Sequence, residues 1–75
     1  MKIAVMGYGT IGSGVVDVLE INKAKIAERA GEPVEVKYIL DLRDFPGDPM
    51  ESAIVHDYKT IVEDPEIGVV VETMG

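Results

Sequence analysis

The sequence has 75 residues, of which 47% are hydrophobic, with a net charge of −7 and no cysteine. Such a chain is long enough for one small folded domain, and the lack of cysteine excludes disulfides and thiolate metal sites. All of the excess negative charge lies in residues 41–75 and no membrane-length apolar segment or signal peptide is present, so we expect a cytoplasmic protein that partners neither nucleic acid nor a membrane.

Residues 2–6 (KIAVM) are the first predicted element. They are mostly apolar and β-prone, and they end at Gly7. A run without polar alternation is typical of a parallel strand that is covered on both faces. We therefore predict a central strand.

Four glycines follow this strand: Gly7, Gly9, Gly12 and Gly14. The first three form G-x-G-x-x-G, a weak signal that gains weight between a strand and a helix. In a dinucleotide fingerprint they permit a tight turn, the approach of a pyrophosphate and close helix packing, and the helix start offers free N–H groups. The alternative is close packing of the helix without a ligand. We expect Gly14, inside the helix, to serve packing.

Apolar residues then recur at the spacing of one helix face: Ile11, Val15, Val18 or Leu19, Ile26 and Ala30. Gly31 follows where a left-handed C-cap is expected. Asn22 interrupts the apolar stripe, so we expect the second half of the helix to bend or to extend beyond the sheet.

The next segments alternate strand and loop patterns. Residues 34–42 (VEVKYILDL) predict a second strand that is more exposed at its start than at its end. A turn-rich loop follows over 43–49, and residues 53–56 (AIVH) predict a short third strand. Asp57 is then placed to cap a short helix over 58–63.

The final predicted element is a buried parallel strand at residues 67–72 (IGVVVE). Strands and helices thus alternate as βαβ units with right-handed crossovers. The predicted fold class is α/β: the first half of a Rossmann-type doubly wound parallel sheet of three to four strands, truncated after Gly75. Because such a half-sheet would expose its last edge, we expect self-association.

Two residues at the end of the second strand and just after it bear on the choice of cofactor. Asp41 stands where an acidic side chain accepts hydrogen bonds from the adenosine ribose of NAD, although it lies 29 residues after Gly12 instead of about 20. Arg43 favours NADP, because a guanidinium can pair with the 2′-phosphate. The preference between NAD and NADP stays open, and a solvated loop or a local ion pair is an alternative for both residues.

His56 is the single histidine, and no Ser, Cys or second ligand accompanies it. We expect a structural or solvent-facing residue. The acidic residues after Asp44 have no metal-ligand spacing, so we predict neither a catalytic set nor a metal site.

Both ends of the chain are similar to one known family. "MGYGTIGSGVVDVL" resembles the N-terminus of homoserine dehydrogenases, with their G-x-G-T-[VI]-G-x-G-V-V pattern, and "IVEDPEIGVVVETMG" resembles their L-x-D-P-x-I-D-[IV]-V-V-E-L-[IM]-G-G stretch. Thr73 replaces the usual Leu, and Gly68 replaces the common Asp. The resemblance implies an oxidoreductase that interconverts L-homoserine and L-aspartate 4-semialdehyde with NAD or NADP, on the route to threonine and methionine.

The resemblance also implies which residues bind the nicotinamide dinucleotide. Arg43 matches the basic position near the adenosine ribose, and Asp41 remains a candidate beside it. The pyrophosphate loop and the turn near the nicotinamide ribose correspond to Gly7, Tyr8, Gly9, Thr10, Ile11 and Gly12, and to Thr73, Met74 and Gly75. The family's catalytic and substrate-binding residues follow this region, so we expect residues 1–75 to be a partial dinucleotide-binding domain that is inactive alone.

Two alternatives stay open. One is another amino-acid or aldehyde oxidoreductase with the same N-terminal unit, such as an aspartate dehydrogenase or an aspartate-semialdehyde dehydrogenase. The other is a regulatory nucleotide-sensing module that binds a dinucleotide without chemistry. Activity of the full-length protein on homoserine would separate these classes.

Overall fold

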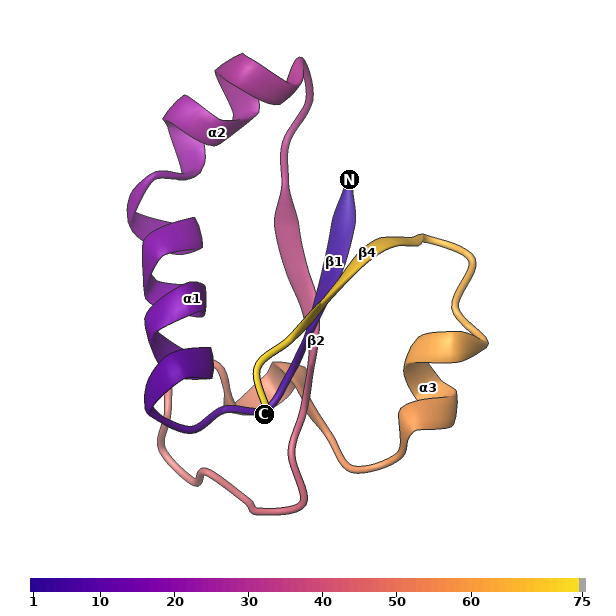
Figure 1. Cartoon of the computed structure of the whole chain (residues 1–75). Coiled ribbons are helices and arrows are strands. Elements are labelled where there is room, and N and C mark those ends of the chain that lie inside the picture. The colour runs from indigo at the N-terminus through magenta and orange to yellow at the C-terminus, as the bar shows by residue number, and fades with distance from the viewer. Residues whose placement is uncertain (75) are drawn as a thin grey trace.

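Four parallel strands form one sheet in the order β3-β2-β1-β4, in a computed structural model that describes residues 1–74 (Figure 1). The strands are β1 (Lys2–Met6), β2 (Glu35–Leu40), β3 (Ile54–Val55) and β4 (Ile67–Glu72). The helices are α1 (Thr10–Ile21), α2 (Lys23–Ala30) and α3 (Tyr58–Val62), and a 3-10 turn, η1, covers Glu51–Ala53. The predicted α/β class and the all-parallel sheet are confirmed.

Strand β1 lies in the middle of the sheet and pairs with both β2 and β4. One face of the sheet packs Val5 against Val16 of α1, and the other packs Ala4 against Ile61 of α3. Helices therefore cover opposite faces, as the two sides of Figure 1 show. This two-sided burial explains why β1 has no polar alternation, and its prediction as a central strand is confirmed.

The predicted long helix is divided at Asn22, which ends α1 and precedes α2. Its side-chain amide donates a hydrogen bond to the carbonyl of Val18, so a polar side chain competes for the helical backbone at the break. Gly31 has a φ of 78° and closes α2 with its N–H on the carbonyl of Ala27. The expected bend and the left-handed C-cap are both confirmed.

The predicted apolar face of the first helix is only partly confirmed, because Val15 and Leu19 are half-buried. Gly12 and Val16 are the buried residues of α1, whereas Ile11 and Val18 are exposed. The phase of the helix is fixed by Gly12, which packs against the turn after β1, and its neighbour on the same face is Val16. A glycine adds nothing to a hydrophobic pattern, so the pattern did not place Gly12 and Val16 at the centre of the buried face.

Strand β4 was expected to be buried, and this expectation is wrong for the described residues. Val69 and Val70 are each 43% exposed. Among the described strands β4 pairs with β1 alone, so its other edge has no strand partner within residues 1–74.

The segment between β2 and β4 contains the shortest elements. Strand β3 has two residues and pairs with the end of β2. Asp57 caps α3 by accepting a hydrogen bond of 2.9 Å from the N–H of Lys59, which confirms the predicted cap. The turn η1 was not predicted. In the part of the chain that the structure describes, no helix combines the length and apolar character that crossing a membrane requires.

Candidate functional site

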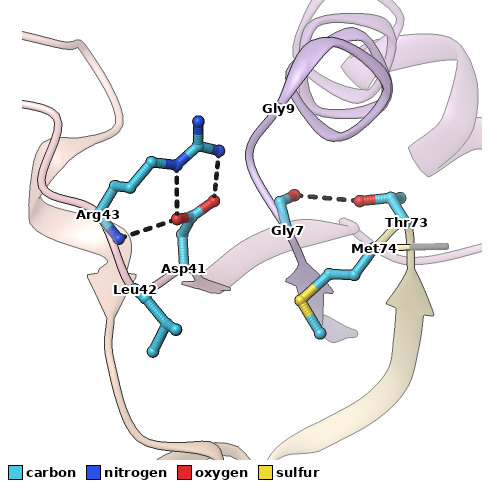
Figure 2. A pocket seen from close by; sticks show the side chains of 7 residues that line it. All are labelled: Gly7, Gly9, Asp41, Leu42, Arg43, Thr73 and Met74. Atoms are coloured by element: carbon cyan, nitrogen blue, oxygen red, sulfur yellow. Dashed lines mark hydrogen bonds and ion pairs between the residues drawn. The ribbon is translucent and has the colours of Figure 1, made fainter.

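A pocket of about 470 Å³ opens where β1, β2 and β4 end. It is lined by Gly7, Gly9, Asp41, Leu42, Arg43, Thr73 and Met74. Figure 2 shows the Asp41 and Arg43 pair on one side and Gly7, Thr73 and Met74 on the other. Ligands of open α/β sheets bind at this carboxyl edge, where successive crossovers leave toward opposite faces. The topology thus brings together six of the predicted residues from three separate parts of the sequence. The other predicted residues that the structure describes do not line the pocket: Tyr8, Thr10, Ile11 and Gly12.

Gly7 is required by the geometry of the turn. It has a φ of 103°, and its N–H donates a hydrogen bond of 2.7 Å to the carbonyl of Leu40. A β-carbon at this position would lie 2.8 Å from Cγ of Met74 and 2.9 Å from Oγ1 of Thr73. Both the backbone conformation and the lack of space therefore demand glycine.

Gly12 and Gly9 differ sharply in the space around them. A β-carbon on Gly12 would lie 1.9 Å from the carbonyl oxygen of Gly7, so the helix could not approach the turn. On Gly9 it would meet, among the described atoms beyond the neighbouring residues, only Nη2 of Arg43 at 3.8 Å. The fold itself requires Gly7 and Gly12, whereas the space over Gly9 is open.

The start of α1 faces this open space with backbone donors. Gly9 is the N-cap, and within residues 1–74 no side chain caps the helix. The first helical hydrogen bond runs from the N–H of Ser13 to the carbonyl of Gly9, at 2.8 Å. The N–H groups of Thr10, Ile11 and Gly12 come before it and have no acceptor within the helix. No acidic residue lies in the first turn. This arrangement is electrostatically suited to an anion.

Asp41 joins the glycine turn to Arg43. Its Oδ2 accepts from the N–H of Tyr8 at 2.9 Å and from Nη2 of Arg43 at 3.0 Å. Its Oδ1 accepts from the backbone N–H and from Nε of Arg43, at 2.9 and 3.0 Å. These bonds from the Arg43 side chain, helped by the two backbone N–H groups, hold the pKa of Asp41 well below its usual range. The residue is only 8% exposed, and it is ionised at neutral pH.

Aromatic residues hold Arg43 from the other side. Its guanidinium lies over the ring of Phe45, 5.2 Å from the centroid, and Phe45 packs edge-to-face on Tyr8 at 5.0 Å. The hydroxyl of Tyr8 donates to Oδ1 of Asp48 at 2.9 Å. Burial, followed by this bond to Asp48, raises the pKa of Tyr8 to about 12. The side chain of Tyr8 therefore connects the glycine turn to the loop at residues 45–48.

Thr73 connects the end of β4 to the same turn. Its hydroxyl lies 2.9 Å from the carbonyl oxygen of Met6 and 3.1 Å from that of Gly7, and it donates to them. The hydroxyl that distinguishes Thr73 from the usual Leu thus has a defined structural partner. Met74 lines the pocket beside it, and Gly75 lies outside the described residues.

Sequence reasoning missed Leu42 and the side-chain role of Tyr8. Leu42 lines the pocket and is 88% exposed. An apolar residue between Asp41 and Arg43, in a charged loop, is the signal that could have identified it. Gly14 was expected to serve packing, and this is wrong: no described atom outside its own helical neighbourhood lies within 4 Å of a β-carbon built there.

His56 lies next to the pocket loop and does not line the pocket. Its Nδ1 is 2.7 Å from the carbonyl oxygen of Asp41, and its Nε2 is 2.9 Å from Oδ1 of Asp44. The hydrogen bond to the Asp41 carbonyl, followed by the contact with Asp44, raises the pKa of His56. These two contacts connect His56 to both ends of the segment 41–44, which is consistent with the structural role expected for His56.

Comparison with known proteins gives the same family at both the sequence and the structural level. The whole chain is 41% identical to homoserine dehydrogenase of Pseudomonas aeruginosa and 36% identical to that of Helicobacter pylori, and it covers 18% of each. The crystal structure of S. aureus homoserine dehydrogenase at pH 6.5 matches all of the chain with a TM-score of 0.87 and 31% identity, over 19% of that protein.

No family model matches the chain. The chain spans about a fifth of the length of the relatives that it matches. Within them it corresponds to the start of the enzyme, whose Rossmann-like α/β fold it shares. By sequence and by fold, the whole chain is similar to the start of homoserine dehydrogenases.

Proposed function

We propose that this chain binds a nicotinamide dinucleotide, as the cofactor-binding part of an enzyme that interconverts L-homoserine and L-aspartate 4-semialdehyde. The observation that carries the proposal is the open space over Gly9, where a β-carbon would fit the free protein. A glycine that the fold does not require is explained by a ligand that needs the same space. The similarity of the whole chain to homoserine dehydrogenases supports the identity of that ligand.

Each part of the pocket suits one part of the dinucleotide. The N–H groups at the start of α1 would bind the pyrophosphate. Arg43 and Asp41 would lie toward the adenosine ribose, and Thr73 and Met74 toward the nicotinamide ribose. When bound, the cofactor supplies a nicotinamide ring that accepts or donates a hydride. The described residues bind and orient it, and we assign them no catalytic step.

Gly9→Val tests this proposal. The valine side chain would occupy the space meant for the pyrophosphate, so we expect the affinity for NAD and NADP to fall by about tenfold or more, which is at least about 1.4 kcal/mol of binding free energy. Isothermal titration calorimetry measures the affinities, and circular dichroism checks that the fold is kept. Gly14→Ala, in the same helix and outside the pocket, is the matched control. Unchanged affinity in Gly9→Val would contradict the proposal.

The enzymatic part is tested on the full-length protein. We expect NAD(P)-dependent oxidation of homoserine and none of aspartate. Oxidation of aspartate instead would favour the aspartate dehydrogenase alternative. Dinucleotide binding without oxidation of either substrate would favour a nucleotide-sensing module.

We also propose that copies of the chain associate through the exposed edge of β4. Val69 and Val70 of this strand are each 43% exposed, and unpaired strand edges are templates for pairing with another chain. Light scattering over a range of concentrations should detect the association, and Val69→Lys should weaken it by placing a charge at the edge. A monomer at every concentration would contradict this proposal.

A further inference from the structure

The carboxylate of Asp41 has as many hydrogen-bond donors around it as its two oxygens can accommodate. A carboxylate offers about four lone-pair sites. Three are used by Arg43, through its backbone N–H, Nε and Nη2, and the fourth by the backbone N–H of Tyr8. A ribose hydroxyl would have to displace one of these donors to reach Asp41.

Arg43 has donors to spare. Two of the five N–H groups of its guanidinium go to Asp41, which leaves three for other acceptors. The side chain is 64% exposed and lines the pocket. Asp41 and the Phe45 ring fix its orientation, so less conformational entropy is lost when it binds a ligand.

We infer that Asp41 is a positioning residue, which orients Arg43 and anchors the glycine turn, and that Arg43 instead of Asp41 contacts the 2′ group of the adenosine ribose. The inference rests on the proposed function. It differs from the usual role of an acidic residue after the second strand, which accepts hydrogen bonds from the ribose. A prepositioned guanidinium beside a 2′-phosphate favours NADP over NAD.

The test compares Asp41→Asn, Arg43→Ala and the double variant in the full chain, with affinities for NADP and NAD from isothermal titration calorimetry. We expect the unaltered chain to bind NADP more tightly than NAD by about tenfold or more, the range of a charge-assisted hydrogen bond. Each single variant should bring this ratio close to one. Arg43→Ala removes the guanidinium. In Asp41→Asn the amide NH2 replaces a carboxylate oxygen, so a donor faces N–H groups that now donate to Asp41.

The double variant should lower the ratio no further than Arg43→Ala alone, because Asp41 acts on the 2′ group through Arg43. Glu28→Gln is the matched control. It removes one negative charge from the exposed surface of α2, away from the pocket residues, and it should leave the ratio unchanged. A change in the control as large as that in Asp41→Asn would overturn the inference in favour of a general charge effect.

Two outcomes for Asp41→Asn would overturn the inference. A larger loss for NAD than for NADP would mean that the carboxylate contacts the ribose directly. Equal losses with the ratio intact would mean that Asp41 only supports the turn.

Arg43→Lys is the second variant, since it keeps the buried carboxylate in place if Asp41→Asn fails to fold. An ammonium cannot reproduce the bidentate contact with Asp41, so we expect the ratio to fall severalfold, and an unchanged ratio would contradict the inference. If the unaltered chain bound neither dinucleotide, the proposed function would fail and this inference with it. The other outcomes leave the proposed function in place.

Discussion

Gly12 approaches Gly7 so closely that a β-carbon on Gly12 would lie 1.9 Å from the carbonyl oxygen of Gly7. The contact joins the first helix to the end of the central strand, and no flexible side chain is available to yield. We therefore expect Gly12→Ala to lower the free energy of unfolding by about 1–3 kcal/mol, the usual cost of overpacking. Urea unfolding followed by circular dichroism measures this change. A variant as stable as the unaltered chain would contradict the close contact.

Gly14→Ala should have the opposite effect on stability. The position is helical, exposed and open to a β-carbon. Replacing glycine inside a helix removes an entropic penalty, so we expect a gain of about 0.5–1 kcal/mol in the free energy of unfolding. Urea unfolding measures this change as well. Gly12 and Gly14 lie about half a helical turn apart, so the two variants compare a tightly packed glycine with an open one. A loss of stability here would restore the packing role that the sequence suggested.

Thr73→Val tests the connection between β4 and the glycine turn. Valine has nearly the same shape and lacks the hydroxyl that donates to the carbonyls of Met6 and Gly7. We expect a loss of about 0.5–1.5 kcal/mol in the free energy of unfolding, the usual net value of one hydrogen bond. Thr60→Val on α3 is the control, because Thr60 is exposed and should change stability by less than about 0.5 kcal/mol. Equal effects of both variants would argue against the connection.

The ionisation of His56 should be measurable by NMR titration. Both ring nitrogens face oxygen acceptors, so both bonds form only when the ring is protonated. The pKa of His56 is raised above 6.5, first by the Asp41 carbonyl and then by Asp44. Because folding raises its pKa, His56 contributes stability to the folded state. This contribution is fully present below the pKa of the unfolded chain and is lost as pH rises through the pKa of the folded chain.

Asp44→Asn provides the control for that titration. It removes a charged acceptor and leaves the carbonyl of Asp41, so we expect the pKa of His56 to fall only part of the way toward 6.5. A pKa at or below 6.5 in the unaltered chain would contradict the bracing of residues 41–44 by His56.

Features that depend on nearby residues could be predicted from the sequence. Gly31 ends α2 because a left-handed residue closes a helix within one turn. Asp57 caps α3 because its side chain reaches the N–H of Lys59. The alternation of strands and helices was likewise sufficient for the parallel sheet, since crossover geometry follows from chain order.

Features that depend on distant contacts could not be predicted. The rotation of α1 follows from the approach of Gly12 to Gly7, which no apolar period records. The burial of β4 depends on which strand lies beside it and not on its own β-branched residues. Six of the predicted site residues line one pocket. The four donors around Asp41 come from Tyr8 and Arg43, and their geometry is absent from a residue pattern.

The pairing of β1 with β4 has a consequence for the order in which the protein folds. Lys2 lies beside Ile67 and Met6 beside Glu72, so the central strand cannot complete its hydrogen bonds until the chain has been made through β4. Contacts between such distant residues require closure of a long loop before they stabilise anything, and they slow folding. The pocket walls at Gly7 and Thr73 also meet only at this step. During synthesis, the capacity to bind a ligand should therefore arise in a single step, when β4 pairs with β1, which makes binding itself a reporter of this pairing.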